Sequence, residues 1–395
     1  MAIPDNSTFK VLLLSAWYPY EGDPMFGLFV RKHALAVAEK CSVVVLHACN
    51  GDTGAQKYRI VENNENQLVE ILVYYKKSNN RYWGKFQNFI RWMVAYRKGF
   101  DKVKAERGLP DIVHANILTR TVLLALYVKL KFGIPYIITE HWSRYLTRNT
   151  SDNGYFRNFI TKLAIRHSNA LSVVSDKLGR AMVDRGLTQK YTVIPNVIDT
   201  QLFDIIPGKS SRNRKTIVHV SCFEERSKNM SGLIEAVNVL SQRRDDFVLR
   251  MIGTGQDFQK SVDHAHRLGL QDSCITFEGM KEGAELSALV AGADLMVLPS
   301  RYETFGIVVF EGLACGIPVL VSDVADLGLL INETYGKVLP DIEPETIARY
   351  IDEMLDELHK YNPQLLRNFI TERFSKQKVC ADTIALYSMS LNLPK

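Results

Sequence analysis

Two glutamates eight residues apart, Glu303 and Glu311, lie in the segment SRYETFGIVVFEGLACGIPVLVSD. An apolar run ends at Leu298-Pro299-Ser300, Gly306 opens a short helix, and Gly316-Ile317-Pro318 ends it. The unpaired N–H groups at such a helix start favour a phosphate. Carboxylates on either side of that phosphate suit the hydroxyl groups of a sugar and a ribose, which indicates a sugar-nucleotide site. The alternative is a solvated Glu303 and a Glu311 that interacts only with the helix dipole.

A lysine follows a predicted strand in the segment VSCFEERSKNMSGLIEA. Lys228 precedes the next helix, and Arg226 lies two residues before it. A cation at the end of a strand can stabilise a pyrophosphate leaving group as negative charge develops. The alternative is an ordinary solvated loop lysine.

Glycines mark a second possible phosphate loop at Gly253-Thr254-Gly255, between a predicted strand and a helix. Phe258 stands where a dinucleotide fingerprint has its third glycine, so a tight strand-to-helix turn is the competing interpretation. The chain contains no GxxxxGK[ST] segment, and its first strand is followed by no glycine fingerprint. These features argue against a P-loop NTPase and a nicotinamide dehydrogenase.

Apolar runs and helical patterns alternate along the 395 residues, which predicts parallel α/β units in two Rossmann-like domains. The polar segment from Thr200 to Lys215 reads as a linker. We expect an N-terminal acceptor domain at 1–205, a donor domain at 206–375, and a final helix at 376–395 that crosses back to the first domain. Open parallel sheets bind ligands at the carboxyl ends of their strands, so two facing domains are expected to enclose a cleft.

Basic residues concentrate in one part of a chain whose net charge is only +6. Residues 76–107 hold ten Lys or Arg and two acidic residues, with aromatic residues between them. A helix at 81–107 of this composition suits an anionic membrane surface. Alternatively, its apolar side chains face the core, namely Trp83, Phe86, Phe89, Ile90 and Met93. No nucleic-acid module is recognisable, so we expect no nucleic-acid partner.

The cellular location is predicted from the cysteines and from the apolar runs. Six scattered cysteines without metal-ligand spacing indicate reduced thiols. No apolar run reaches the roughly 20 residues of a membrane span, and the start of the chain reads as a buried strand. We expect a cytoplasmic protein, peripheral on the inner face of the membrane if the basic helix binds lipid.

The order of several segments resembles the retaining glycosyltransferases of family four, which have the GT-B fold. The segments are YTVIPNVIDTQLF, HVSCFEERSKN, MIGTG, FEGM and ADLMVLPSRYETFGIVVFEGLACGIPVLVSD. The resemblance implies that Glu303 binds donor-sugar hydroxyls, Glu311 the ribose and Lys228 the phosphates. It further implies that the pyrophosphate is held by backbone groups of Thr304, Phe305, Gly306 and Ile307, with Gly253 and Arg226 nearby, and that the base packs at Gly279 and Met280.

In the first half the resemblance assigns three residues. His141, in TEHWSR, corresponds to a histidine that packs against the donor sugar near its anomeric carbon. Gly27, in GDPMFGLFVRKH, resembles a glycine loop that approaches donor and acceptor, where Arg31 and Lys32 are expected to add positive charge. Arg144 is an expected acceptor-side or phosphate contact.

Three positions depart from the family pattern. Cys222 stands at or beside the place of an arginine that joins the lysine at the phosphates, and Arg226 is the candidate to replace it. Asn229 and Val197 stand where the family has glycine. Because a β-branched residue tolerates a positive φ badly, the turn at Val197 is expected to differ locally.

The function implied is transfer of a sugar, with retention, from a nucleotide-sugar to a glycan or lipid-linked glycan in polysaccharide biosynthesis. No nucleophilic carboxylate is evident near His141 except the adjacent Glu140, so the departing phosphate is expected to take the acceptor proton. No DxD-like motif lies in a suitable loop, so neither a metal nor another cofactor is expected. The alternatives are a GT-B epimerase or phosphorylase, or a non-catalytic sugar-nucleotide-binding protein, for which the Cys222 departure leaves room.

Overall fold

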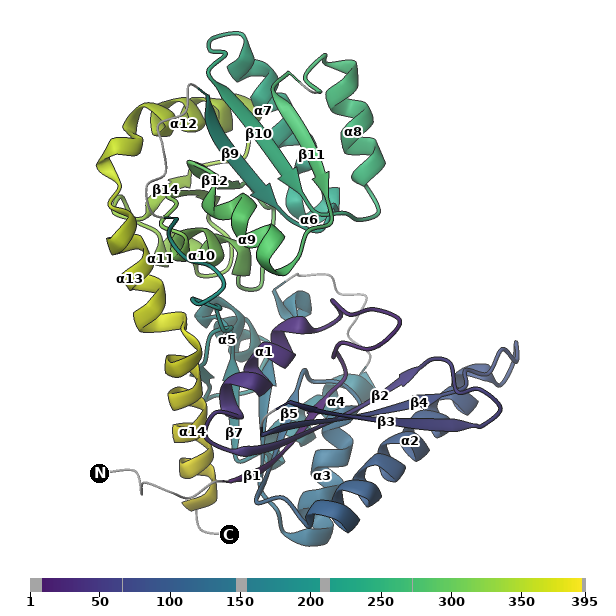
Figure 1. Cartoon of the computed structure of the whole chain (residues 1–395). Helices are drawn as coiled ribbons and strands as arrows, with labels where there is room; N and C mark the ends of the chain where they lie inside the picture. The colour runs from purple at the N-terminus through teal and green to yellow at the C-terminus, as the bar shows by residue number, and fades with distance from the viewer. Residues whose placement is uncertain (1–8, 66, 147–154, 207–213, 272, 393–395) are drawn as a thin grey trace. The chain divides into compact units, whose positions relative to one another are not determined.

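A computed structural model describes residues 9–65, 67–146, 155–206, 214–271 and 273–392 (Figure 1). The chain divides into two compact units, which are described separately. Unit 1 comprises Met1–Val197 and Val379–Lys395, and unit 2 comprises Ile198–Lys378.

Unit 1 is built on an eight-stranded sheet with the order β3-β4-β2-β1-β5-β6-β7-β8. All neighbouring strands are parallel except β3, which pairs antiparallel with β4. The strands are β1 (Lys10–Ser15), β2 (Ser42–Asn50), β3 (Tyr58–Glu65), β4 (Leu68–Tyr75), β5 (Ile112–Asn116), β6 (Tyr136–Glu140), β7 (Ala170–Val173) and β8 (Thr192–Val193). The helices are α1 (Leu28–Val37), α2 (Gly84–Arg107), α3 (Thr121–Phe132), the 3-10 turn η1 (Ser143–Tyr145), α4 (Tyr155–His167) and α5 (Asp176–Asp184).

Unit 2 has a six-stranded, fully parallel sheet with the order β11-β10-β9-β12-β13-β14. The strands are β9 (Lys215–Val220), β10 (Phe247–Ile252), β11 (Ile275–Gly279), β12 (Leu295–Leu298), β13 (Val319–Ser322) and β14 (Gly336–Leu339). The helices are α6 (Glu225–Lys228), α7 (Met230–Ser241), α8 (Phe258–Arg267), α9 (Gly283–Ala291), α10 (Ile307–Ala314), α11 (Leu327–Leu330), α12 (Pro344–Glu357), η3 (Leu358–Lys360) and α13 (Pro363–Phe374). The long helix α14 (Lys376–Asn392) follows and lies mostly within unit 1.

Two parallel α/β units confirm the predicted fold class, and most predicted strands agree with the structure within a few residues. The pattern missed β3 and β14, which are the outermost strands on one side of each sheet. Strand β3 reads YRIVENNE and leaves most of its side chains partly or fully exposed. An edge strand of this kind carries polar residues that blunt further pairing, so it lacks a buried strand's apolar signal.

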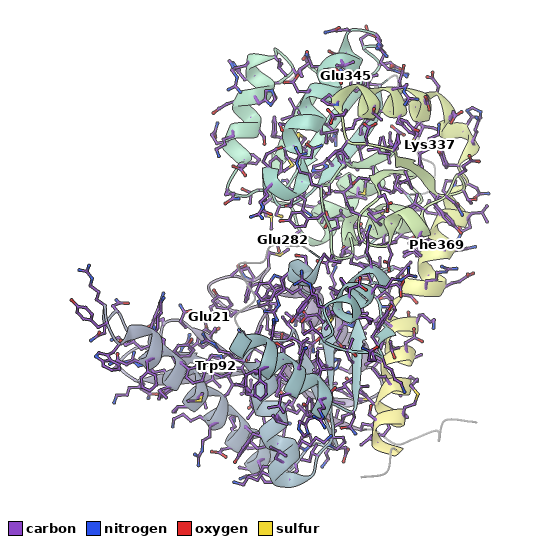
Figure 2. All side chains as sticks on the ribbon, turned by 180° about the vertical axis from the view of Figure 1, so that it is seen from behind. Glu21, Trp92, Glu282, Lys337, Glu345 and Phe369 are labelled. Carbon is purple, nitrogen blue, oxygen red and sulfur yellow. The ribbon has the colours of Figure 1, made fainter. Side chains whose placement is uncertain are left out.

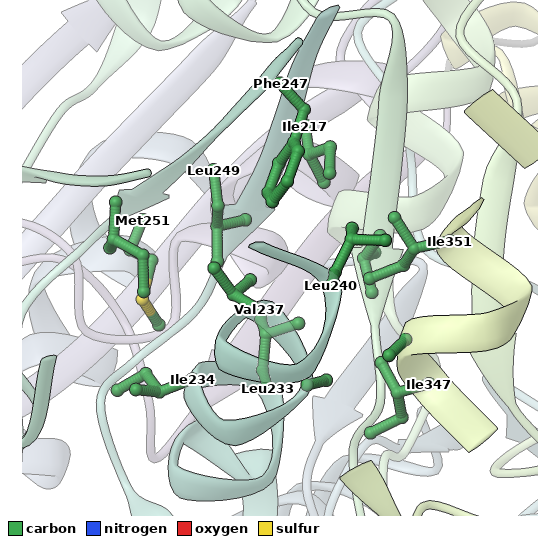
Figure 3. Packing of buried hydrophobic residues seen from close by; sticks show 14 of the residues in the cluster. Ile217, Leu233, Ile234, Val237, Leu240, Phe247, Leu249, Met251, Ile347 and Ile351 are labelled. Carbon is green, nitrogen blue, oxygen red and sulfur yellow. The ribbon is translucent and has the colours of Figure 1, made fainter. Parts of the chain in front are cut away.

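The core of unit 2 forms where α7 packs between the sheet and α12 (Figure 3). Leu233, Val237 and Leu240 repeat at helical spacing on α7 and are fully buried. They face β9 and β10 on one side and Ile347 and Ile351 of α12 on the other. This packing holds the carboxyl end of β9 in place.

A buried polar chain crosses unit 1 from the sheet to α14. The His114 ring is bonded at Nδ1 to the Tyr387 hydroxyl and at Nε2 to the Thr139 hydroxyl, both at 2.7 Å. Thr139 in turn contacts the Ser172 hydroxyl at 2.6 Å. Because buried polar groups must be paired, this chain ties α14 to β5 and β6 in addition to apolar packing by Val379 and Leu386.

The division between the units differs from the predicted boundaries at 205 and 375. Ile198 donates its backbone N–H to Phe374 at 2.9 Å, and Arg367 donates to the carbonyl groups of Thr200 and Phe203. These bonds attach residues 198–203 to unit 2. The first residues of α14 belong to unit 2, and its residues from Val379 onward belong to unit 1.

Buried neutral histidines make the stability of unit 1 depend on pH. Burial, with a minor effect of neighbouring His33 for His114, lowers the pKa of His33 and His47 to about 4 and that of His114 to about 3. Each ring therefore binds its proton near pH 6.5 in the unfolded chain but only below these values in the folded unit. The free energy of unfolding is therefore highest above pH 6.5. It falls as the pH drops towards 4, and each histidine lowers it by up to about 1.4 kcal/mol per pH unit.

All four tryptophans lie in unit 1, so urea unfolding followed by tryptophan fluorescence measures this unit. We expect the free energy of unfolding to fall steeply between pH 6.5 and 4. His114→Gln should flatten that slope, whereas the exposed His359→Gln should not change it. A stability that stays constant over this pH range would contradict the buried neutral state.

Candidate functional site

The sheet of unit 2 has its topological switch point between β9 and β12. Strands β10 and β11 continue on one side of β9, and β13 and β14 continue on the other side of β12. The connections that leave the carboxyl ends of β9 and β12 therefore diverge, and a crevice that suits a ligand is expected there. Lys228 follows β9 and Glu303 follows β12.

Lys228 and Glu303 are in direct contact at this switch point. The Lys228 ammonium group donates a hydrogen bond to Glu303 Oε1, which also accepts one from the Ser300 hydroxyl at 2.9 Å. The two charged side chains are only 15% and 11% exposed. Burial opposes the charged form of Lys228, but the attraction of Glu303 and the hydrogen bond outweigh it and raise the Lys228 pKa. Lys228 is therefore a fixed cation near the sheet edge.

The loop after β12 is anchored by aromatic packing. Phe305 is 5% exposed, and its ring lies 4.7 Å from Phe310 and 5.8 Å from Phe374. Gly306 adopts φ 83° and ψ 50°, a left-handed conformation that favours glycine, and α10 begins at the next residue. Within the described residues no side chain caps this helix, and Val309 donates its N–H to the Gly306 carbonyl at 3.0 Å. The N–H groups of Ile307 and Val308 therefore remain available to an anion. Thr304 and Ile307, on either side of this turn, are partly exposed.

Glu311 lies in a different environment from Glu303. It is 5% exposed on α10, and its charge contributes, after burial, to a Cys315 pKa raised to about 12. The contacts of Glu303 are with Lys228 and Ser300 rather than with Glu311. The spacing of the two glutamates in the sequence therefore does not make them a pair in space; the structure pairs Glu303 with Lys228.

The cations beside Lys228 differ in their partners. Arg226 is exposed and makes no ion pair with the described residues. The sequence did not single out Arg301, which bonds to the side chains of Glu225 (3.3 Å) and Asn229. Its backbone N–H also donates to the Ser227 carbonyl at 2.8 Å, so it holds α6 against the loop after β12. Its only sequence signal was its place directly after a strand end.

The departures from the family pattern have local explanations. Asn229 joins α6 to α7 with φ 57° and ψ 44°, a left-handed conformation that asparagine tolerates better than most residues. Val197 is buried and is not among the described residues with positive φ, so its turn accommodates a β-branched side chain. Cys222 is exposed and close enough to Lys228 and Glu303 to interact with their charges.

The glycines of unit 2 fall into two kinds. A Cβ at Gly253 would lie 1.9 Å from the Ser221 carbonyl oxygen, and one at Gly255 would lie 2.7 Å from the Phe223 backbone. Close backbone packing therefore requires both, in agreement with a tight strand-to-helix turn. Gly279 has φ 67° and open space around its Cβ position, and the following Met280 is 46% exposed. The surface at Gly279 and Met280 is therefore accessible to a flat ligand.

In unit 1 the switch point lies between β1 and β5. Asn116 ends β5, and His141 follows β6, the next strand. Asn116 Oδ1 lies 3.0 Å from His141 Nε2, while Asn116 Nδ2 and His141 Nδ1 are buried without a hydrogen-bond partner among the described residues. Burial, followed by the neighbouring His33 and His114 and opposed by Asn196, holds the His141 pKa well below its ordinary value. The ring is therefore neutral and has unused hydrogen-bonding capacity.

Glu140 organises the turn around His141. Its two oxygens accept backbone N–H bonds from Leu118 (3.0 Å), His141 (2.9 Å) and Trp142 (2.8 Å). The side chain is fully buried, and burial raises its pKa although Arg144 and the backbone donors oppose the shift. A carboxylate held in this way orients the backbone of the turn that carries His141.

The other predicted residues of unit 1 are held by local contacts. Gly27 adopts φ 69° before α1, and a Cβ there would lie 2.4 Å from the backbone of Trp17. Arg31 forms ion pairs with Glu65 and Glu70 at 2.6 and 2.7 Å, so its charge is already neutralised. Arg144 donates to the Leu118 carbonyl and lies over the Trp142 and Tyr145 rings at 4.4 and 4.7 Å.

The described residues contain no group of three or more His, Cys, Asp or Glu side chains arranged to hold a metal ion.

Comparisons with known proteins match both units. Residues 30–202 match the family described as Glycosyltransferase Family 4, and residues 203–370 match Glycosyl transferases group 1. An uncharacterized glycosyltransferase of Methanocaldococcus jannaschii is 25% identical over 372 residues, covering 93% of this chain and 95% of the relative.

Two solved structures show the same fold. Sucrose-phosphate synthase from Thermosynechococcus elongatus superposes with a TM-score of 0.73 at 18% identity, covering 96% of this chain and 98% of that one. The HepE protein of Anabaena, in complex with UDP, also gives 0.73 at 18% identity, covering 96% and 99%. These likenesses confirm the GT-B fold.

The contact between Lys228 and Glu303 predicts an asymmetric effect on stability. Glu303→Ala leaves a buried ammonium group unpaired and should lower the stability of unit 2 by about 3 kcal/mol. The double variant Lys228→Met/Glu303→Gln removes both charges and should cost less than about 1 kcal/mol. Hydrogen exchange of the β9 and β12 amides measures both effects.

Glu235→Ala is the matched control, because Glu235 pairs with His264 on a more exposed surface. If Glu303→Ala destabilised these strands no more than Glu235→Ala, the buried contact would be contradicted.

Proposed function

Because the chain belongs to the family-four glycosyltransferases with the GT-B fold, we propose that it transfers a hexosyl group, with retention, from a nucleotide-sugar to a glycan or lipid-linked glycan in polysaccharide biosynthesis. The observation that carries the proposal is the buried contact of Lys228 with Glu303 at the switch point of unit 2. The HepE protein, which has the same fold, was solved with UDP and with UDP-glucose.

The donor side of the site uses groups that are already oriented. An ammonium group has three donors and a carboxylate has about four acceptor positions, so Lys228 and Glu303 can keep their contact while binding a ligand. Lys228 and the first turn of α10 supply positive charge to the diphosphate, and Glu303 accepts hydrogen bonds from sugar hydroxyls. Glu311 is assigned to the ribose, and Gly279 with Met280 to the base.

The chemical step needs little from the protein beyond position and charge. The proton of the acceptor hydroxyl passes to the departing phosphate, while the new glycosidic bond forms on the face that the phosphate leaves. Neutral His141 donates from Nε2 to Asn116 Oδ1, so its Nδ1, which has no partner among the described residues, can accept a hydrogen bond from a sugar hydroxyl without adding charge. Since Lys228 and α10 stabilise the leaving group, the mechanism proposed requires no metal ion.

The donor site is tested by thermal shift and turnover with UDP-, GDP- and ADP-sugars. We expect one nucleotide class to be hydrolysed or transferred, and Lys228→Met and Glu303→Gln to lower kcat/KM by about a hundredfold or more. Arg226→Met should give an intermediate loss if this exposed cation replaces the family arginine. Arg243→Met, an exposed arginine on a separate loop, is the neutral control.

Two results would count against this function. Binding without turnover across the whole donor and acceptor panel would favour a non-catalytic sugar-nucleotide-binding protein. Unchanged kcat/KM in both Lys228→Met and Glu303→Gln would remove the donor site from the switch point.

Helix α2 supports a peripheral contact with an anionic membrane. The alternative that Trp83, Phe86, Phe89, Ile90 and Met93 face the core is wrong for four of these residues. Trp83 and Phe86 are 66% and 60% exposed, and Ile90 and Met93 are 37% and 39% exposed. The buried face of α2 is made further along the helix, by Ala95, Tyr96, Gly99, Phe100 and Val103. In Figure 2 the α2 side chains, near the Trp92 label, project from the ribbon of unit 1.

The charged residues at the start of α2 support the same membrane contact. Arg81 and Lys85 are exposed beside these aromatic rings, and no acidic residue occurs between Lys76 and Phe100. Within the described ranges, no helix combines the length and apolar character required to span a bilayer. We propose that α2 lies at the lipid interface, where aromatic rings enter the headgroup region and basic side chains contact anionic lipids.

The tryptophans allow a direct test of the membrane surface. In Trp17→Phe/Trp142→Phe protein only Trp83 and Trp92 emit, and both lie on or next to α2. We expect a blue shift with vesicles that contain phosphatidylglycerol and none with phosphatidylcholine alone. Neutralising Lys85, Arg91 and Arg97 should abolish co-sedimentation with the anionic vesicles; unchanged co-sedimentation would overturn the proposed contact.

A further inference from the structure

The junction between α6 and α7 carries an asparagine in a conformation that favours glycine. Asn229 directly follows Lys228, adopts φ 57° and ψ 44°, and is only 2% exposed. Asparagine enters the left-handed region more readily than most residues, but only glycine enters it without a steric cost. Because buried polar groups are normally paired, an asparagine at this junction is expected to use its side chain for hydrogen bonds.

The Asn229 side chain bonds to two loops that are distant in sequence. Its Oδ1 accepts a hydrogen bond from Arg301 Nη2, in the loop after β12. Its Nδ2 donates to the Ile342 carbonyl at 3.4 Å, in the loop before α12. The amide thus joins the end of α6 to segments that lie 72 and 113 residues further along the chain.

Gly232 makes room for this side chain. A Cβ at Gly232 would lie 2.6 Å from Asn229 Nδ2 and 2.7 Å from Asn229 Oδ1. Gly232 lies in the first turn of α7 and is not among the described glycines with positive φ, so its backbone conformation admits alanine. Alanine is also more favourable than glycine within a helix. The space that the Asn229 amide occupies is therefore what requires glycine at position 232.

Arg301 holds the same junction by its backbone and by its side chain. Its N–H donates to the carbonyl of Ser227, the residue before Lys228, at 2.8 Å. Its guanidinium group contacts Glu225 Oε1 at 3.3 Å in addition to Asn229, the residue after Lys228. Arg301 therefore contacts the chain on both sides of Lys228.

These contacts determine where the Lys228 ammonium group lies. The loop that carries Arg301 also carries Glu303, which accepts the hydrogen bond from Lys228. A lysine side chain is a flexible stem, and its charge stabilises a developing negative charge best when it is already oriented. We propose that Asn229, Gly232 and Arg301 form a tether that positions Lys228 for the departing phosphate, an inference that rests on the proposed transferase function. All three act through Lys228, so they are positioning residues.

A double-mutant cycle tests whether the tether acts through Lys228. The assay is turnover of the UDP-, GDP- or ADP-sugar that the wild-type protein uses. Arg301→Met should lower kcat about tenfold in protein that carries Lys228, and less than about twofold in Lys228→Met protein. The Arg301 side chain is 46% exposed, so its truncation leaves the core of unit 2 in place. Equal losses in both backgrounds would assign Arg301 a general structural role and overturn the proposal.

Arg349→Met is the matched control for this cycle. Arg349, on α12, is 55% exposed and also contacts a single carboxylate, Glu353 Oε1 at 3.4 Å. The control removes the same charge and a similar ion pair, and it should leave kcat unchanged in both backgrounds. A loss in Arg349→Met as large as that in Arg301→Met would show an effect of surface charge and would overturn the tether.

A second cycle tests the space at Gly232. Gly232→Ala should displace the Asn229 amide from Arg301 and lower kcat about tenfold. Asn229→Gly keeps the left-handed conformation but removes the amide, so it should cause a similar loss. In Asn229→Gly protein, Gly232→Ala should then cause no further loss. An unchanged kcat in Asn229→Gly protein, or a full additional loss in the double variant, overturns the tether.

Hydrogen exchange tests the tether without turnover. The Lys228 N–H donates to the Glu224 carbonyl at 2.9 Å, and the Asn229 N–H donates to the Glu225 carbonyl at 3.2 Å. We expect both amides to exchange at least about tenfold faster in Arg301→Met and Gly232→Ala protein, and at the wild-type rate in Arg349→Met protein. Unchanged exchange in the first two variants overturns the tether.

The two proposals fail in different ways. Wild-type turnover of a donor, together with unchanged kcat in Arg301→Met and Gly232→Ala protein, overturns the tether and leaves the transferase intact. Absence of any donor turnover in the wild-type protein rejects the transferase, while hydrogen exchange still decides whether these residues hold Lys228.

Discussion

Every strand of unit 2 runs in the same direction, and this constraint shapes the site. Parallel strands deliver all their carboxyl-end loops to one edge of the sheet, and the reversal of strand order between β9 and β12 leaves a gap between two of them. Lys228 and Glu303 enter that gap from opposite sides, 75 residues apart in the chain. Once both charges are largely withdrawn from water they must pair, and the pairing in turn holds the loop after β12 against α6.

Unit 1 uses the same geometry with different side chains. Its switch point between β1 and β5 carries neutral His141, Asn116 and the rings of Trp17, Phe29 and Trp142, where unit 2 has the contact of Lys228 with Glu303. Burial is the main cause of this neutrality. The nearby His33 further lowers the pKa of His141 and of His114, and His114 also lowers that of His141. One unit thus carries a fixed positive charge at its switch point, and the other carries neutral polar groups and aromatic rings there.

The groups at both switch points are held in place by local contacts. The Glu140 carboxylate accepts three backbone N–H groups, Arg144 covers an indole ring, and Phe305 packs in an aromatic cluster with Phe310 and Phe374. In a sequence alone, a glutamate also suits a nucleophile, an arginine suits a phosphate ligand, and a phenylalanine suits a hydrophobic contact with a base. Burial and partners distinguish these roles, and neither is a property of one residue alone.

Much of the protein was determined by local sequence. Alternating apolar runs predicted the α/β units, Gly306 and Gly316 bounded α10, and the order of short segments indicated the family. These features depend on backbone preferences and on neighbours a few residues away. The edge strand β3, the exposure of Trp83 and Phe86, the contact of Lys228 with Glu303, the place of Arg301 and the gathering of Trp17 with Trp142 were decided only by the tertiary structure. Each of them depends on which distant segments the sheet places side by side, and the periodicity of a single segment carries no information about its partners.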